Sequence, residues 1–166
     1  MDEMYVEQIV EKKPTPLDGV LRVCGIAVPA LIFLAGLFVF GITVICIGVI
    51  LAFACYCVLP RLNVEYEYLY LSKEFSVDRI FNKEKRKKAG EFPLSQLEIM
   101  APVSSHGLDS YTNRIDKTLD FSSKDPEAKV YAMIFNNNGF TKVLVEPNEE
   151  MLKAIKREFP RKVMEY

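Results

Sequence analysis

The sequence predicts a membrane-anchored α+β protein, in which an apolar helical hairpin precedes a β-rich domain that ends in a helix. Three observations lead to this fold class. Residues 23–60 contain no Asp, Glu, Lys, Arg or His, although 26% of the 166 residues are charged. Alternating apolar and polar residues follow this run directly, and an amphipathic helical pattern comes near the end of the chain. The mean hydropathy of +0.10 therefore averages two unlike parts, which excludes a disordered chain, a wholly soluble domain and a many-span transporter.

The apolar run is long enough for two short membrane spans. The hydrocarbon core of a bilayer is about 30 Å thick, and a helix that rises about 1.5 Å per residue crosses it with about 20 residues. We expect a transmembrane hairpin over residues 20–60, with spans at about residues 20–38 and 41–59 and a break near residues 38–41. Gly48 and Ala52 form a small-xxx-small pair, which either packs the two helices together or mediates association between chains.

Charged residues on both sides of the apolar run predict its orientation. The flanking cations are Lys12, Lys13, Arg22 and Arg61, and the break between the spans is uncharged. The positive-inside rule then places residues 1–19 and 61–166 in the cytoplasm, on a protein integral to the cytoplasmic membrane. Five acidic residues among the first 19 exclude a signal peptide. All four cysteines lie in the apolar run, so we expect buried thiols rather than disulfides or a metal site.

Seven strands are predicted in a cytoplasmic domain of residues 61–166. Their patterns cover residues 64–71, 75–81, 86–92, 97–103, 117–122, 130–135 and 140–146. Asn138-Gly139 tolerates the positive φ of a tight turn and predicts a hairpin between the last two strands. Residues 104–114 are polar and are interpreted as a loop.

A helix is predicted over residues 148–159. Asn148 is a good N-cap, acidic residues follow it, and Pro160 stops the helix. Leu152, Ile155 and Phe159 form a one-sided apolar stripe that we expect to cover the core. The pattern of residues 2–10 fits either an amphipathic helix or a strand added to the sheet, and the sequence leaves both possibilities open.

This succession of elements resembles the bacterial pleckstrin-homology-like (PH-like) domain. The segments that carry the resemblance are residues 64–71, the hairpin of residues 136–139 and the terminal helix of residues 148–159. The resemblance implies a seven-stranded antiparallel open barrel capped by the C-terminal helix. Two transmembrane helices followed by such a domain are similar to small, uncharacterised membrane proteins of Gram-positive bacteria.

The strongest charge cluster lies between the second and third predicted strands. Its cations are Lys83, Lys85, Arg86, Lys87 and Lys88. If the first strand leaves the membrane and the second returns by a similar length, the connecting turn faces the inner leaflet, where cations attract anionic lipid. We therefore predict a lipid-surface contact here; the alternative is a solvated hairpin that protects a sheet edge. Nucleic acid is a weaker interpretation, because residues 61–166 contain 18 cations and 17 anions.

No catalytic motif accompanies the single histidine, His106, so we expect neither enzymatic activity nor a cofactor or metal. The leading hypothesis is a membrane-anchored interaction module that binds a protein or anionic-lipid partner at the cytoplasmic face of the membrane. The alternative is a structural subunit of a larger membrane complex, assembled through the hairpin of residues 20–60. The residues specify neither the protein partner nor the oligomeric state.

Overall fold

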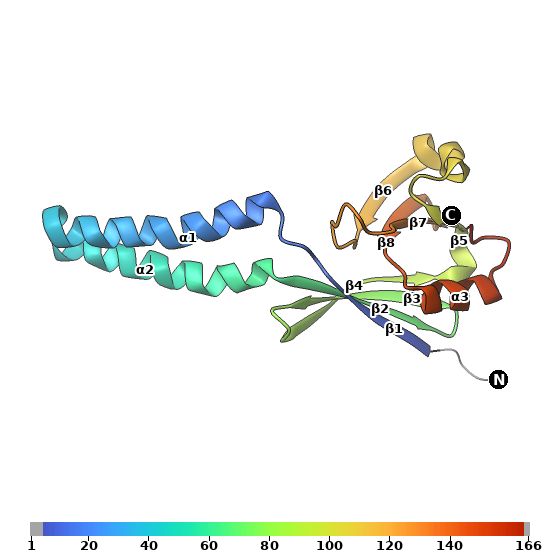
Figure 1. Ribbon diagram of the computed structural model, residues 1–166, viewed down its shortest axis with the longest axis horizontal. Coiled ribbons are helices and arrows are strands. Elements are labelled where there is room, and N and C mark those ends of the chain that lie inside the picture. Colours follow the sequence, from blue (N-terminus) through green and yellow to red (C-terminus); the bar gives the residue numbers. More distant parts are fainter. Residues whose placement is uncertain (1–4, 165–166) are drawn as a thin grey trace. The chain divides into compact units, whose positions relative to one another are not determined.

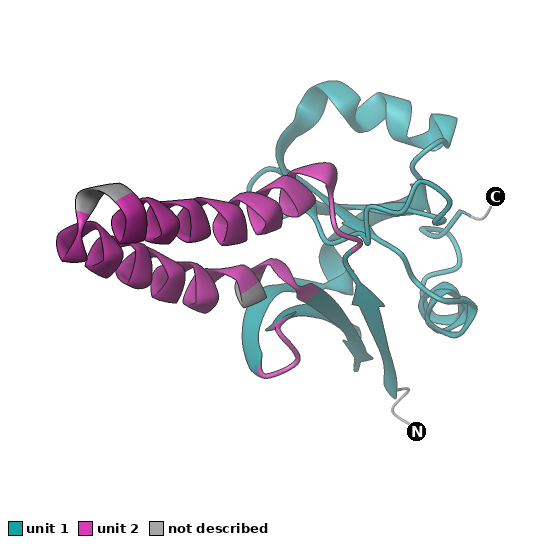
Figure 2. Ribbon diagram, turned by 60° about the vertical axis from the view of Figure 1, so that its left-hand side comes forward, with its two compact units in different colours: residues 1–12, 65–80, 85–166 teal, residues 13–64, 81–84 magenta. Residues whose placement is uncertain are grey.

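The computed structural model describes residues 5–164, except for the side chains of residues 39, 40, 60 and 61. The chain divides into two compact units, which are coloured separately in Figure 2. The sheet unit comprises residues 1–12, 65–80 and 85–166, and the hairpin unit comprises residues 13–64 and 81–84.

Two four-stranded sheets build the sheet unit (Figure 1). The first has the order β1-β2-β3-β4, with β1 (Tyr5–Glu11), β2 (Val64–Leu71), β3 (Glu74–Phe81) and β4 (Lys85–Pro93). The second has the order β5-β7-β8-β6, with β5 (Leu97–Pro102), β6 (Ile115–Asp120), β7 (Tyr131–Asn136) and β8 (Phe140–Val145). Helix α3 (Glu149–Glu158) follows the last strand. The seven strands predicted from alternation are all present, and β1 is an eighth.

The predicted purely antiparallel arrangement is wrong at one pair. Strands β1 and β2, β5 and β7, and β7 and β8 pair antiparallel, but β6 runs parallel to β8. A tight hairpin between β6 and β7 would have made them antiparallel neighbours. Instead, residues 121–130 connect them, which is long enough to carry the chain past β8. Buried Phe121 anchors the start of this connection, where the Tyr68 hydroxyl donates to its carbonyl oxygen at 2.6 Å.

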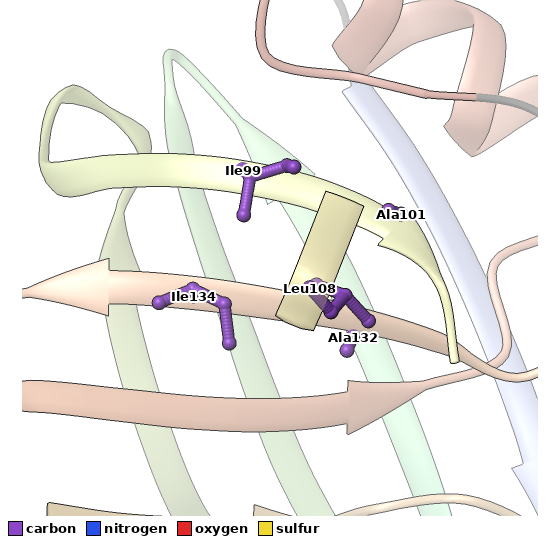
Figure 3. Packing of buried hydrophobic residues seen from close by; sticks show 5 residues of the cluster. All are labelled: Ile99, Ala101, Leu108, Ala132 and Ile134. Carbon is purple, nitrogen blue, oxygen red and sulfur yellow. The ribbon is translucent and has the colours of Figure 1, made fainter. Parts of the chain in front are cut away.

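Apolar side chains cover both faces of the second sheet. On one face, the fully buried residues include Met100, Met133 and Val143. On the other, a separate cluster contains Ile99, Ala101, Leu108, Ala132 and Ile134 (Figure 3). Leu108 belongs to the 3₁₀ segment His106–Arg114, so the predicted loop of residues 104–114 is largely helical and packs on the sheet.

Helix α3 begins where the sequence predicts. The Asn148 side chain accepts a hydrogen bond from the Met151 amide at 2.7 Å, which caps the helix. The side chains that it buries fully are Met151, Ala154 and Ile155, whereas Leu152 and Phe159 are half-buried. The covering face is therefore rotated relative to the predicted stripe, although Ile155 is common to both.

Strand β1 resolves the open alternative for residues 5–10 in favour of a strand; residues 2–4 of the predicted segment lie outside the described residues. Val6 and Val10 are buried, and residues Tyr5–Glu11 pair in antiparallel register with β2, so that Glu11 lies opposite Glu65. The Gln8 side chain donates to the Glu146 carbonyl at 2.8 Å and accepts from the Asn148 amide at 2.7 Å. The apolar hairpin is thus an insertion between two paired strands of one sheet.

Two apolar helices form the hairpin unit: α1 (Pro16–Ala35) and α2 (Ile42–Val58). A π-helical turn, Gly36–Phe40, and then Gly41 at φ 73° join them, which agrees with the predicted break. Helix α1 begins before residue 20 because Thr15 and Asp18 form a capping box. Residues Pro16–Phe38 are long and apolar enough to cross a membrane, whereas Ile42–Val58 is apolar but shorter.

Glycines allow the two helices to approach closely. A Cβ atom added at Gly36 would lie 2.7 Å from the backbone nitrogen of Ile45, and one at Gly48 would lie 3.1 Å from that of Phe33. Gly48 therefore packs the hairpin itself, one of its two predicted roles. The cysteines are free thiols, and Cys24, Cys46 and Cys57 are exposed on the helices rather than buried.

Candidate functional site

The candidate site starts at the turn between β3 and β4. Asn82 and Lys83 have φ angles of 51° and 60°, and the Glu84 amide donates to the Phe81 carbonyl at 3.1 Å. These features define a two-residue turn of type I′, which matches the right-handed twist of the strands that it joins. Asn adopts positive φ more easily than most residues, so the local sequence suits this turn. The turn fixes Lys83 at the tip of the hairpin.

This turn belongs to the hairpin unit together with α1 and α2 (Figure 2). The Asn82 amide donates to the carbonyl oxygen of Asn63 at 3.0 Å. Asn63 directly follows the 3₁₀ segment Leu59–Leu62 that ends the helical hairpin, and its side chain accepts from Arg22. The turn lies beside Asn63 because β2 and β3 have the same length. Each has eight residues, so the chain that leaves the helices at residue 64 returns to the same level at residue 81.

The four remaining predicted cations begin strand β4, and all are exposed. Two of them have carboxylate partners. Arg86 Nη1 lies 2.9 Å from Glu67 Oε2, and Lys88 Nζ lies 2.6 Å from Glu91 Oε2, which raises the pKa of Lys88. Among the residues that the structure describes, Lys85 and Lys87 have no carboxylate partner. The positive charge available to an external ligand on β4 therefore comes mainly from these two lysines.

Glu67 is the functional neighbour that sequence reasoning missed. It lies on the polar face of β2, yet it is only 6% exposed, because side chains from the neighbouring strands cover it. The alternation of residues 64–71 identified this face, but the strand order that brings Arg86 to Glu67 is a tertiary property. Arg86, one of the five predicted contact residues, is thus already paired with a buried carboxylate.

Other titratable residues do not assemble into a site within the described part of the chain. His106 is fully exposed, and its only recorded partner there is Asp109, 3.2 Å away on the same 3₁₀ segment. Across residues 5–164, no group of three His, Cys, Asp or Glu side chains is placed to hold a metal ion. The groups that the candidate site presents to an external ligand are its exposed lysine side chains, which attract anions.

The chain was compared with known families, curated proteins and solved structures. A family model described as a bacterial PH-like domain, DUF6106, matches residues 2–165. This match includes β1 and both apolar helices as well as the later strands. No curated protein and no solved structure matches the chain.

Proposed function

The chain belongs to the DUF6106 family of bacterial PH-like domains, and from this we propose that it is a membrane-anchored interaction module whose β3–β4 turn contacts anionic lipid. PH-like domains are generally non-catalytic modules that commonly bind proteins or lipids. The membrane anchor, the cytoplasmic location of both termini and the lipid contact are the finer parts of the proposal.

The surfaces of the two helices support a membrane anchor. Apolar side chains that would contact water in a soluble protein are exposed on both helices, among them Leu17, Ile26, Leu31, Ile50 and Phe53. A chain of 23 residues spans about 34 Å as a helix, enough for a bilayer core, whereas the 17 residues of α2 reach about 26 Å. Small mismatches of this size are accommodated by local thinning of the bilayer. We propose that both helices cross, which leaves both termini on the cytoplasmic side.

The hydrogen bond between the Asn82 amide and the Asn63 carbonyl is the observation that carries the lipid proposal. It holds the turn beside the residue at which the chain leaves α2, which in an inserted hairpin is the level of the lipid headgroups. Lys83 stands at the tip of this turn, and Lys85 and Lys87 follow it. A cation near an anionic leaflet contributes about 1 kcal/mol, so three lysines contribute at most about 3 kcal/mol.

Lipid selectivity of the full chain tests the proposal. The protein is placed in nanodiscs of phosphatidylcholine and phosphatidylglycerol, and spin-labelled lipids report which of the two it retains at its surface. We expect a preference for phosphatidylglycerol that falls with added salt and is largely lost in the triple variant K83Q/K85Q/K87Q. The matched control K117Q/K129Q/K153Q removes three exposed lysines elsewhere and keeps the preference. Equal selectivity in the two triple variants would refute the lipid contact.

One observation favours the alternative, a subunit assembled through the helical hairpin. An apolar groove of about 720 Å³ runs along the hairpin, and its lining includes Gly25, Pro29, Phe33, Gly48 and Ala52. Small residues at such a surface permit close approach of another helix within a membrane. Ala52→Leu would fill the groove, so it disrupts a detergent-stable complex under this alternative and leaves lipid selectivity unchanged under the leading proposal.

A further inference from the structure

Two glutamates from neighbouring strands meet on the outer face of the first sheet. In the register of β1 and β2, Ile9 lies opposite Glu67, and Glu7 lies opposite Leu69. Glu7 and Glu67 are therefore diagonal neighbours on one face of an antiparallel pair, within reach of each other's side chains. Their carboxyl groups are close enough to shift each other's pKa, that of Glu7 downward and that of Glu67 upward.

The surroundings of Glu67 favour a proton at this carboxyl pair. Its Oε2 atom is satisfied by Arg86, but its Oε1 atom is buried and has no donor among the described residues. A buried carboxylate oxygen without a donor is strongly unfavourable. Glu7 itself receives a hydrogen bond from the Tyr5 hydroxyl. Two ionised carboxylates have no hydrogen to share, so Glu7 and Glu67 can hydrogen-bond to each other, and satisfy the Oε1 atom of Glu67, only when one of them is protonated.

The charges that face the pair come from all four strands of the sheet. Tyr5 and Glu7 belong to β1, Glu67 to β2, Asp78 to β3 and Arg86 to β4. Burial, and then the hydrogen bond to Glu7, raise the pKa of Glu67, and Asp78 acts in the same direction against Arg86. The hydrogen bond from Tyr5, and then that from Glu67, lower the pKa of Glu7. Such a pair loses its two protons in separate steps, one above and one below the ordinary glutamate value.

We propose that Glu7 and Glu67 bind a single proton between them, and that this proton fastens β1 to the rest of the sheet. Strand β1 leads through residues 12–15 directly into helix α1. When the shared proton leaves, two adjacent carboxylates face one guanidinium, and their repulsion acts across the β1–β2 pair. The folded state binds this proton more tightly than the unfolded chain does. Its stabilising effect is therefore present at low pH and is lost as the pH rises through the raised pKa of Glu67.

Hydrogen exchange of the full chain in nanodiscs, followed by mass spectrometry, tests this site. Protection of the peptide containing residues 5–11 is measured between about pH 5 and pH 8 and corrected for the intrinsic exchange rate. We expect the protection of the intact protein to fall several-fold, up to about tenfold, across this range, while peptides from β7 remain constant. Glu67→Gln and, separately, Glu7→Gln remove the shared proton and make the β1 protection independent of pH.

Two further measurements keep the result unambiguous. Glu74→Gln changes an exposed carboxylate at the start of β3 and should retain the pH dependence of the intact protein. Carboxyl ¹³C shifts of labelled glutamates should show one group that titrates above the ordinary value and disappears in Glu67→Gln. The proposal is overturned if β1 protection is flat with pH in the intact protein, or if its slope persists in Glu7→Gln, an exposed substitution that leaves the core intact.

Discussion

The β-sheet domain should fold without the helical hairpin but not without strand β1. Because Glu11 lies opposite Glu65 in the antiparallel register, residues 12 and 64 face each other at the open end of the β1–β2 pair. Replacing residues 13–63 with Asn-Gly joins the strands through a two-residue turn of the preferred type. We expect the resulting chain to be soluble and folded. A chain that starts at residue 64 lacks both the hairpin and β1, and we expect it to be unfolded or nearly so.

The magnitude follows from what β1 buries and bonds. Val6 and Val10 are 5% and 8% exposed, and burial of a valine contributes about 1.5 kcal/mol at the low end of the usual range, or about 3 kcal/mol for both. Gln8 makes two hydrogen bonds to the main chain between β8 and α3, each of which contributes about 1 kcal/mol. The loss of β1 thus costs about 5 kcal/mol, which is comparable with the entire stability of a small domain.

Urea denaturation followed by circular dichroism distinguishes the two chains. The Asn-Gly chain should show a cooperative transition, and the chain that starts at residue 64 should show none, or one at a much lower urea concentration. Gln8→Ala in the Asn-Gly chain should lie between them, destabilised by about 2 kcal/mol. If the shorter chain unfolds at the same urea concentration as the Asn-Gly chain, β1 does not contribute to the free energy of unfolding and the reasoning fails.

Two further substitutions have expected outcomes. Gly36→Ala places a Cβ atom 2.7 Å from helix α2 and should lower the midpoint of thermal unfolding in detergent by several degrees, whereas Gly19→Ala, in open space, should leave it unchanged or raise it slightly. Tyr68→Phe removes the donor to the buried Phe121 carbonyl and should destabilise the Asn-Gly chain by about 1–3 kcal/mol in urea denaturation, while Tyr111→Phe should change its stability by less than half as much.

Alternation is clearest in a strand whose two faces carry different side chains. In β2, Tyr66, Tyr68 and Tyr70 are buried, and Glu65, Glu67 and Leu69 occupy the alternate positions, so the sequence itself shows the period of two. The Asn138-Gly139 turn is equally local, with Asn138 at φ 54°. Pairing direction is not local: the residues of β6 indicate a strand, but nothing in them selects parallel pairing with β8. That choice depends on how Phe121 and the connection after it pack, which is a property of the folded core.

In the candidate site, too, the local features were predictable from the sequence and the tertiary contacts were not. The five cations of the tract are visible in the sequence, and the lengths of β2 and β3 were enough to predict that their turn returns to the end of the helices. Which of those cations are paired with a carboxylate was not predictable from the sequence. Glu67 is 19 residues from Arg86 and contacts it only across β3. The same arrangement creates the carboxyl pair, since Glu7 comes from a segment separated from β2 by the whole helical hairpin.

That separation explains why β1 was ambiguous and how it nevertheless forms. Residues 2–10 carry apolar side chains that suit one face of a helix or alternate positions of a strand, so local pattern cannot decide. Pairing β1 with β2 requires closure of a loop of more than 50 residues, and the entropic cost of closure grows with the logarithm of loop length. The inserted segment reduces this cost because its two helices pack antiparallel and return the chain to its starting level, where Arg22 of α1 bonds Asn63 after α2. Helix packing in the hairpin and strand pairing in the sheet therefore support each other. A substitution such as Gly36→Ala, which separates the helices, should weaken the protection of β1 from hydrogen exchange as well as that of the helices.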